Sequence, residues 1–127
     1  MRVFKNKVFA RFAERNNIED HHLCDAVQRA ERGLIDADLG GGVIKQRVAR
    51  PGKGRSGGFR TIILFRTTER AFFVYGFAKN RKANIEEHQL KAFKAVAGTA
   101  LNMTNTELQI LLQLGELIEV KYDEKNI

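Results

Sequence analysis

The sequence of 127 residues predicts an α+β fold, with a small antiparallel sheet of three or four strands and helices at both ends of the chain packed on it. Two observations predict this class. Three central segments are rich in β-branched and aromatic residues. The flanking segments instead repeat apolar residues at helical spacing behind capping signals. The predicted element order is α-α-β-β-β-α-α.

Two helices are predicted before the sheet, over residues 5–15 and 20–32. Asp20 can cap the start of the second helix and Gly33 can end it. Residues 33–42 then form a connection that ends in three glycines. Each helix places apolar side chains on one face: Phe9, Phe12 and Ala13 in the first, and Leu23, Ala26, Val27, Ala30 and Leu34 in the second.

The three predicted strands cover residues 43–50, 59–66 and 70–78. Residues 67–69 are too few for a crossover helix, so the second and third strands should be antiparallel neighbours. The third strand is almost entirely apolar and suits the centre of the sheet. The first strand alternates, with Ile44 and Val48 on one face and Lys45 and Arg47 on the solvent face.

Two capping boxes predict the C-terminal helices. Asn84 with Glu87 opens a helix over about 85–101, and Thr104 with Glu107 opens one that ends near Gly115. The first of these helices points Leu90, Phe93, Ala97 and Leu101 inward. Residues 117–120 form either a short strand or an extended arm. We therefore expect one core domain over residues 1–102 and a C-terminal helical extension, 103–127, packed on it.

The formal net charge of +7 and the sequence pI of about 9.9 favour a polyanionic partner. Nucleic acid is the commonest such partner, although an anionic membrane surface or an acidic protein also fits. Cys24 is the only cysteine, which excludes an intramolecular disulfide and favours a reducing compartment. The first residues lack a signal-peptide apolar run, and no stretch approaches the roughly 20 apolar residues of a membrane span. We expect a cytoplasmic protein with no membrane association.

Two motifs are weak indicators of a cofactor or metal, and we expect neither. Residues 52–57 match Gly-x-Gly-x-x-Gly, but a strand follows them where a dinucleotide site needs a helix. Lys53 and Arg55 in this loop either contact phosphate or belong to a solvated hairpin. His21, His22 and Cys24 lack a second ligand pair, and adjacent helical histidines point in different directions.

The most informative feature is a group of cations from separate segments. In an antiparallel meander, the start of the second strand lies beside the ends of the first and third strands. Arg60, Lys79 and Arg81 should therefore converge at one edge of the sheet, close to the basic loop. Scattered surface charges are the alternative. The whole group comprises Lys45 and Arg47 on the first strand, Arg60 on the second, and Lys79, Arg81 and Lys82 after the third.

Such a group suits RNA cleavage by the 2′-hydroxyl. The planar guanidinium of an arginine stabilises the charge of the phosphorane. A desolvated lysine crowded by other cations has a lowered pKa and can act as a base. Histidine is the residue type best suited to acid–base work near neutral pH, which makes His88 a candidate, although an exposed helix residue is the alternative.

Residues 33–65 and 70–85 resemble the RelE/HigB toxins of type II toxin–antitoxin systems. The resemblance covers about residues 4–100 and is strongest at Gly-Gly-Phe-Arg (57–60) and Phe-Ala-Lys-Asn (77–80), which are fairly specific together. It implies a microbial-RNase-like sheet with helices on one side. It also implies an endoribonuclease that cleaves mRNA, on the ribosome or without it, and a cognate antitoxin, expected to be of the helix-turn-helix type.

The resemblance also implies roles for individual residues. Arg60 matches the strand arginine that contacts the scissile phosphate, and Lys79 and Arg81 match the basic pair after the last core strand. Lys45 and Arg47 match basic residues of the preceding strand. Many RelE-type toxins carry a catalytic tyrosine, but residues 84–90 contain none.

The missing tyrosine leaves two alternatives for proton transfer: His88 substitutes for it, or Arg and Lys act alone. The segment 103–127 either completes the core or offers a docking surface for the antitoxin. The leading hypothesis is an mRNA-cleaving toxin. The runner-up is a non-catalytic RNA- or ribosome-binding module on the same fold.

Overall fold

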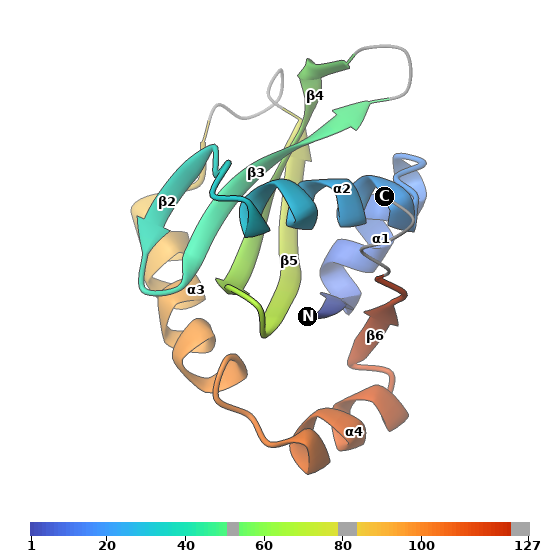
Figure 1. Cartoon of the computed structure of the whole chain (residues 1–127), viewed down its shortest axis with the longest axis vertical. Helices are drawn as coiled ribbons and strands as arrows, with labels where there is room; N and C mark the ends of the chain where they lie inside the picture. The colour runs from blue at the N-terminus through green and yellow to red at the C-terminus, as the bar shows by residue number, and fades with distance from the viewer. Residues whose placement is uncertain (51–53, 79–83, 123–127) are drawn as a thin grey trace.

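One six-stranded sheet, in the order β2-β3-β4-β5-β1-β6, forms the centre of the structure (Figure 1). The computed structural model describes residues 1–50, 54–78 and 84–122, with the backbone alone for residues 50 and 54–57. The strands are β1 (Arg2–Asn6), β2 (Ala37–Gly40), β3 (Val43–Arg50), β4 (Gly54–Arg66), β5 (Arg70–Ala78) and β6 (Leu117–Val120). The helices are α1 (Lys7–Arg15), α2 (Asp20–Glu31), α3 (Glu87–Ala100) and α4 (Asn105–Gln113).

The α+β class and the three central strands are confirmed, but β4 begins at residue 54, five residues before its predicted start, and the predicted count of three or four strands is wrong. β1, β2 and β6 contain five, four and four residues, which is too short for a clear alternating pattern. β1 pairs parallel with β5 and antiparallel with β6, so the sheet is not wholly antiparallel. These pairings join segments at opposite ends of the chain, and local sequence cannot reveal them.

The segment 117–120 is a strand, which was one of its two predicted alternatives. Val120 lies opposite Val3 in the ladder between β6 and β1. The polypeptide after residue 102 thus returns to the sheet through α4 and β6 (Figure 1). The proposed division into a core domain and an extension at this residue stays a prediction.

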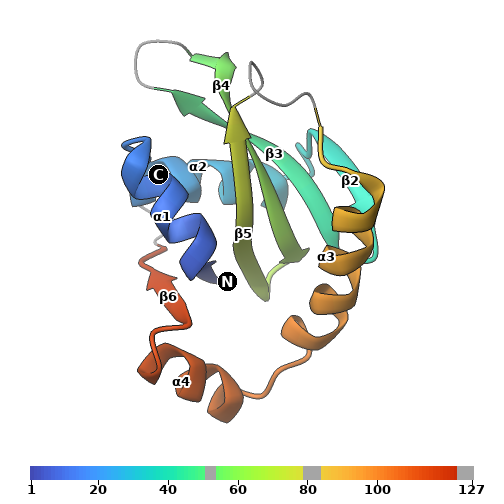
Figure 2. The same ribbon diagram turned by 180° about the vertical axis from the view of Figure 1, so that it is seen from behind.

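Helices cover both faces of the sheet, whereas the family resemblance implied helices on one side. Phe59 and Ile63 of β4 point into a core shared with α1 and α2. Ile62 and Leu64, which alternate with them, point into a second core shared with α3 and α4. Figure 2, seen from behind, shows α3 on the opposite side of the strands from α2. The helices after the sheet therefore bury the face that the helices before it leave uncovered.

The predicted bounds of α2 are accurate to one residue, but its cap differs. Glu19 is the N-cap, and His22 Nδ1 accepts a hydrogen bond of 3.0 Å from the Glu19 backbone N–H, so Asp20 lies inside the helix. Gly33 follows the helix in the left-handed conformation, at φ +82°. Leu34, predicted for the apolar face, is 59% exposed because the chain has already left the helix.

The two C-terminal helices differ in how well the capping boxes were predicted. α3 begins after Glu86, whose box partner is Gln89, so the predicted pairing from Asn84 is wrong by two residues. α4 has the predicted box of Thr104 and Glu107. Hydrogen bonds from Thr104 lower the pKa of the Glu107 carboxyl. On the inner side of α3, the predicted residues Ala97 and Leu101 are buried, and Leu90 and Phe93 are partly buried.

The three glycines at 40–42 end β2 and form the turn into β3. All three have positive φ, at +85°, +61° and +85°, a conformation that favours glycine. A Cβ atom on Gly42 would lie 2.8 Å from Leu101 Cδ1. This segment, interpreted from the sequence as a break, is a tight turn packed against the end of α3.

Gly76 of β5 provides a stability prediction. A Cβ atom there would lie 2.4 Å from Cε2 of Phe12, whose ring packs edge-on against Phe59 at 5.4 Å. We expect Gly76→Ala to lower the free energy of unfolding by about 1–3 kcal/mol, because the ring must leave a packed position. Urea denaturation measures this change. Gly98→Ala is the matched control, since its Cβ would meet no atom within 4 Å, and it should stabilise α3. Equal unfolding midpoints for the two variants would contradict the prediction.

A candidate basic site on the sheet

Arg47 and Arg60 form a like-charged pair across the sheet. They lie directly opposite each other in the antiparallel ladder of β3 and β4. Side chains of directly opposed residues lie on the same face, here the face that α3 partly covers. Arg47 is exposed, whereas Arg60 is only 6% exposed. Two opposed cations destabilise a sheet unless an anion lies between or beside them.

The guanidinium of Arg60 is incompletely satisfied. Within the described part of the chain, its Nη1 is buried and has no hydrogen-bond partner. Burial lowers the pKa of Arg60, the charge of Arg47 lowers it further, and Asp36 partly offsets both effects. The protein thus holds a desolvated cation with a free donor, an arrangement that suits a phosphate or carboxylate ligand.

The neighbours of Arg60 explain its burial. Phe59 is 2% exposed in the core under α1 and α2, and the Thr61 hydroxyl donates a hydrogen bond of 2.9 Å to the Gln46 carbonyl. On the other side of β4, Phe77 lies opposite Arg60 and is 5% exposed. Arg60 therefore lies between the exposed Arg47 and the buried ring of Phe77. Its two chain neighbours are fixed by core packing and by a hydrogen bond.

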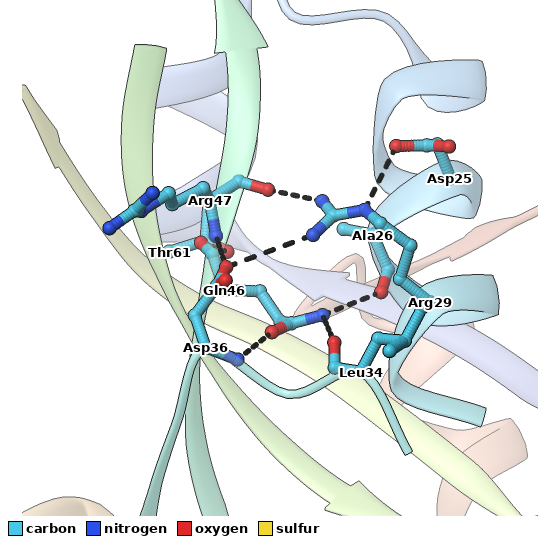
Figure 3. A network of polar contacts seen from close by, with 8 residues as sticks. All are labelled: Asp25, Ala26, Arg29, Leu34, Asp36, Gln46, Arg47 and Thr61. Carbon is cyan, nitrogen blue, oxygen red and sulfur yellow. Dashed lines mark hydrogen bonds and ion pairs between the residues drawn. The ribbon is translucent and has the colours of Figure 1, made fainter. Parts of the chain in front are cut away.

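Gln46 joins β3 to α2 through a fully buried amide (Figure 3). Its Nε2 donates to the carbonyls of Ala26, at 3.0 Å, and Leu34, at 3.2 Å. Its Oε1 accepts from the backbone N–H of Asp36 at 2.7 Å. All three partners are backbone groups, so this side chain fastens the helix and the following connection to the strand that carries Arg47.

Both polar groups of the Arg47 backbone form hydrogen bonds with side chains. Its N–H donates to Asp36 Oδ2 at 2.7 Å, and its carbonyl accepts a hydrogen bond from Arg29 Nη2. Arg29, which is 8% exposed, also pairs with Asp25 at 3.2 Å. In Figure 3 the Arg47 side chain points away from this network. The network therefore fixes the backbone while the guanidinium projects from the other face.

Sequence interpretation missed Arg29, Asp36 and Gln46 as supporting residues. The available signal was a polar residue inside an apolar pattern. Gln46 lies between the predicted inward residues Ile44 and Val48, and Arg29 lies among the apolar residues of α2. Most of their partners are backbone groups distant in the sequence, which side-chain patterns do not indicate.

Lys45 lies two residues from Arg47, on the same face of β3. Its Nζ donates to Asn84 Oδ1 at 3.4 Å, which places it near the start of α3. The structure thus brings three of the predicted cations, Lys45, Arg47 and Arg60, onto one face of the sheet.

His88 is not joined to this group. Its side chain is 77% exposed in the first turn of α3 and forms an ion pair of 3.2 Å with Glu86. No hydrogen bond or ion pair among the described residues connects it to Arg47 or Arg60. Its predicted acid–base role stays a prediction.

Other predicted site residues lie beyond the structural description. Lys53, Lys79, Arg81 and Lys82 are outside the described residues, and for Arg55 only the backbone, in β4, is described. The predicted convergence of Arg60 with Lys79 and Arg81 is therefore untested. The described ranges contain no group of three or more His, Cys, Asp or Glu side chains that could hold a metal ion.

The family described as the RelE toxin of the RelE/RelB toxin–antitoxin system matches residues 1–120. The chain belongs to the RelE toxin family. This confirms the resemblance, and the RelE match runs from β1 to the end of β6. No curated protein is significantly similar to the chain.

Membership of the RelE toxin family has two consequences. RelE toxins form toxin–antitoxin pairs, so the chain has an antitoxin partner. RelE toxins are generally endoribonucleases linked to translation, which agrees with a basic surface. In the described part of this RelE chain, no helix has the length and apolar character needed to cross a bilayer.

Proposed function

We propose that the protein is an endoribonuclease toxin that cleaves mRNA on the ribosome, in the cytoplasm, until a helix-turn-helix antitoxin inhibits it. One observation carries this proposal: the buried guanidinium of Arg60 lies opposite Arg47, and its Nη1 has no hydrogen-bond partner among the described residues. A buried cation without a partner is costly. Such a cation is retained where an anionic ligand pairs with it. The anion that a toxin of this family meets is the RNA backbone.

The reaction is attack by a 2′-hydroxyl on the adjacent phosphorus. The hydroxyl loses its proton, a P–O bond to the 2′-oxygen forms, and the P–O bond to the 5′-oxygen breaks, after which that oxygen takes up a proton. Arg60 contacts the phosphate oxygens and stabilises their charge in the phosphorane. Lys79, Arg81 and His88 are the candidates for moving the two protons.

Further cations bind the RNA on either side of the scissile phosphate. Lys45 and Arg47 extend the basic face along β3. The remaining residues of this set are Lys53, Arg55 and Lys82. Because each such contact releases counterions, binding weakens as the salt concentration rises.

A second candidate function is a non-catalytic RNA- or ribosome-binding module. One observation favours it: the His88 side chain forms an ion pair with Glu86, and among the described residues no hydrogen bond or ion pair joins His88 to Arg47 or Arg60. A module of this kind binds RNA in a salt-sensitive manner and leaves transcripts intact.

Primer extension on a translated mRNA after induction of the protein separates the two candidates. The toxin produces growth arrest and discrete cuts within the reading frame, and co-expression of the adjacent gene's product relieves both. Intact transcripts combined with retained ribosome binding would contradict the nuclease and support the module.

A further inference from the structure

A second row of side chains lies beside the Arg47–Arg60 pair. Lys45, Ile62 and Tyr75 are directly opposite one another on β3, β4 and β5. Each lies two residues from the first row, a displacement of about 6.8 Å along the strands, and on the same face. The face thus carries cations on β3 and aromatic rings on β5, since Phe77 completes the first row.

Tyr75 is the half-buried aromatic residue of this face. Its ring centroid lies 6.0 Å from that of Phe77 and 5.9 Å from that of Phe93 in α3. Aromatic neighbours from two elements hold the ring in place while part of it stays accessible to solvent. The four preceding residues of β5, 71–74, and Phe77 after it are buried, so Tyr75 is a partly accessible position between buried ones.

Lys45 and Asn84 border the same area. Asn84 Oδ1 accepts from Lys45 Nζ at 3.4 Å and from the Ile85 backbone N–H at 2.9 Å. These two contacts orient the amide, so that its oxygen faces the lysine and the start of α3. The amide nitrogen is then a fixed donor next to the ammonium group.

We propose that Lys45, Asn84 and Tyr75 form a nucleotide subsite next to Arg60. In it, the base of an unpaired nucleotide packs on the Tyr75 ring, and Lys45 binds the phosphate that follows or precedes it. The inference rests on the proposed function, because Arg60 supplies the neighbouring phosphate contact. A paired base cannot reach the ring, so the subsite selects single-stranded RNA and makes Tyr75 a specificity-determining residue.

Fluorescence anisotropy with a labelled, single-stranded 2′-O-methyl RNA tests this subsite, since the blocked 2′-oxygen prevents cleavage. The purified full chain with Tyr75→Leu should bind about 5- to 150-fold more weakly, and Tyr75→Phe should bind like the original protein. Lys45→Gln should weaken binding and reduce the salt slope by about one. Lys94→Gln, an equal loss of charge on α3, should leave both unchanged.

A strand with abasic residues provides a test that needs no variant. The original protein should bind this strand more weakly than the matched strand with bases. Equal affinity for the two strands, or unchanged affinity in a folded Tyr75→Leu variant, overturns the subsite and shows that Tyr75 only lines the core.

The failure of the subsite is distinguishable from the failure of the nuclease. Cuts in the primer-extension experiment together with base-independent binding remove the subsite and leave the nuclease. Intact transcripts together with base-dependent binding through Tyr75 remove the nuclease and leave the subsite.

Discussion

Arg60→Met should abolish RNA cleavage and stabilise the protein at the same time. The substitution removes the phosphate contact, so the cleavage rate should fall about 10²- to 10³-fold. It also removes a guanidinium that is 6% exposed, faces Arg47 and, in the part of the chain that the structure describes, has no partner for Nη1. Removal of a buried unsatisfied donor should raise the free energy of unfolding by about 1–3 kcal/mol. Urea denaturation and a cleavage assay on the same preparation measure the two effects.

Arg66→Met on the same strand is the matched control. Arg66 donates to the Leu101 carbonyl at 2.8 Å and forms an ion pair with Glu69 at 3.7 Å, so its charge is satisfied. This variant should retain cleavage and lose a little stability. A cleaving Arg60→Met variant would remove Arg60 from the site. A destabilised one would show that the guanidinium supports the fold.

Gln46→Leu should cause the largest loss of stability among the substitutions considered. Leucine has a similar volume but removes the Gln46 partner of the Leu34 carbonyl and of the Asp36 N–H, whereas the Ala26 carbonyl keeps the hydrogen bond that it accepts within α2. Two orphaned backbone groups at this buried position, together with the lost bond to Ala26, should lower the free energy of unfolding by roughly 3 kcal/mol or more. Chemical denaturation monitored by circular dichroism measures the change.

Gln113→Leu at the exposed end of α4 is the control for Gln46→Leu, since it makes the same chemical change on the surface. It should alter stability by no more than about 0.5 kcal/mol. Similar losses in the two variants would show that the buried amide contributes little beyond its volume.

The two faces of β3 and β4 differ in how their polar groups are satisfied. On the side of α2, the Gln46 amide and the Arg29 guanidinium contact backbone groups and carboxylates, and they hold the strands in place. On the side of α3, Arg60 is buried next to Arg47, and its Nη1 finds no partner within the described ranges. Contacts on the α2 face thus stabilise the two strands. This stability offsets the free-energy cost of the arginine pair on the α3 face when no ligand is bound.

The candidate site was only partly predictable from the sequence. The alternation of β3 placed Lys45 and Arg47 on one face, and the meander placed Arg60 beside them. The burial of Arg60 was not predictable, because it depends on Phe77 of β5 and on the packing of α3 over this face of the sheet. His88 was selected for its residue type alone, and its place on the surface of α3 has no local signal.

For the fold, the sequence by itself determined the α+β class, the central strands β3 and β5, the helix α2 and the Thr104 cap of α4. These features depend on side-chain periodicity and on caps within a few residues. Only the tertiary structure decided that β1 lies between β5 and β6, that helices cover both faces, and that Gln46 joins α2 to β3. The physical reason is that these features consist of contacts between distant segments, whose partners are chosen by packing and by satisfaction of buried backbone groups.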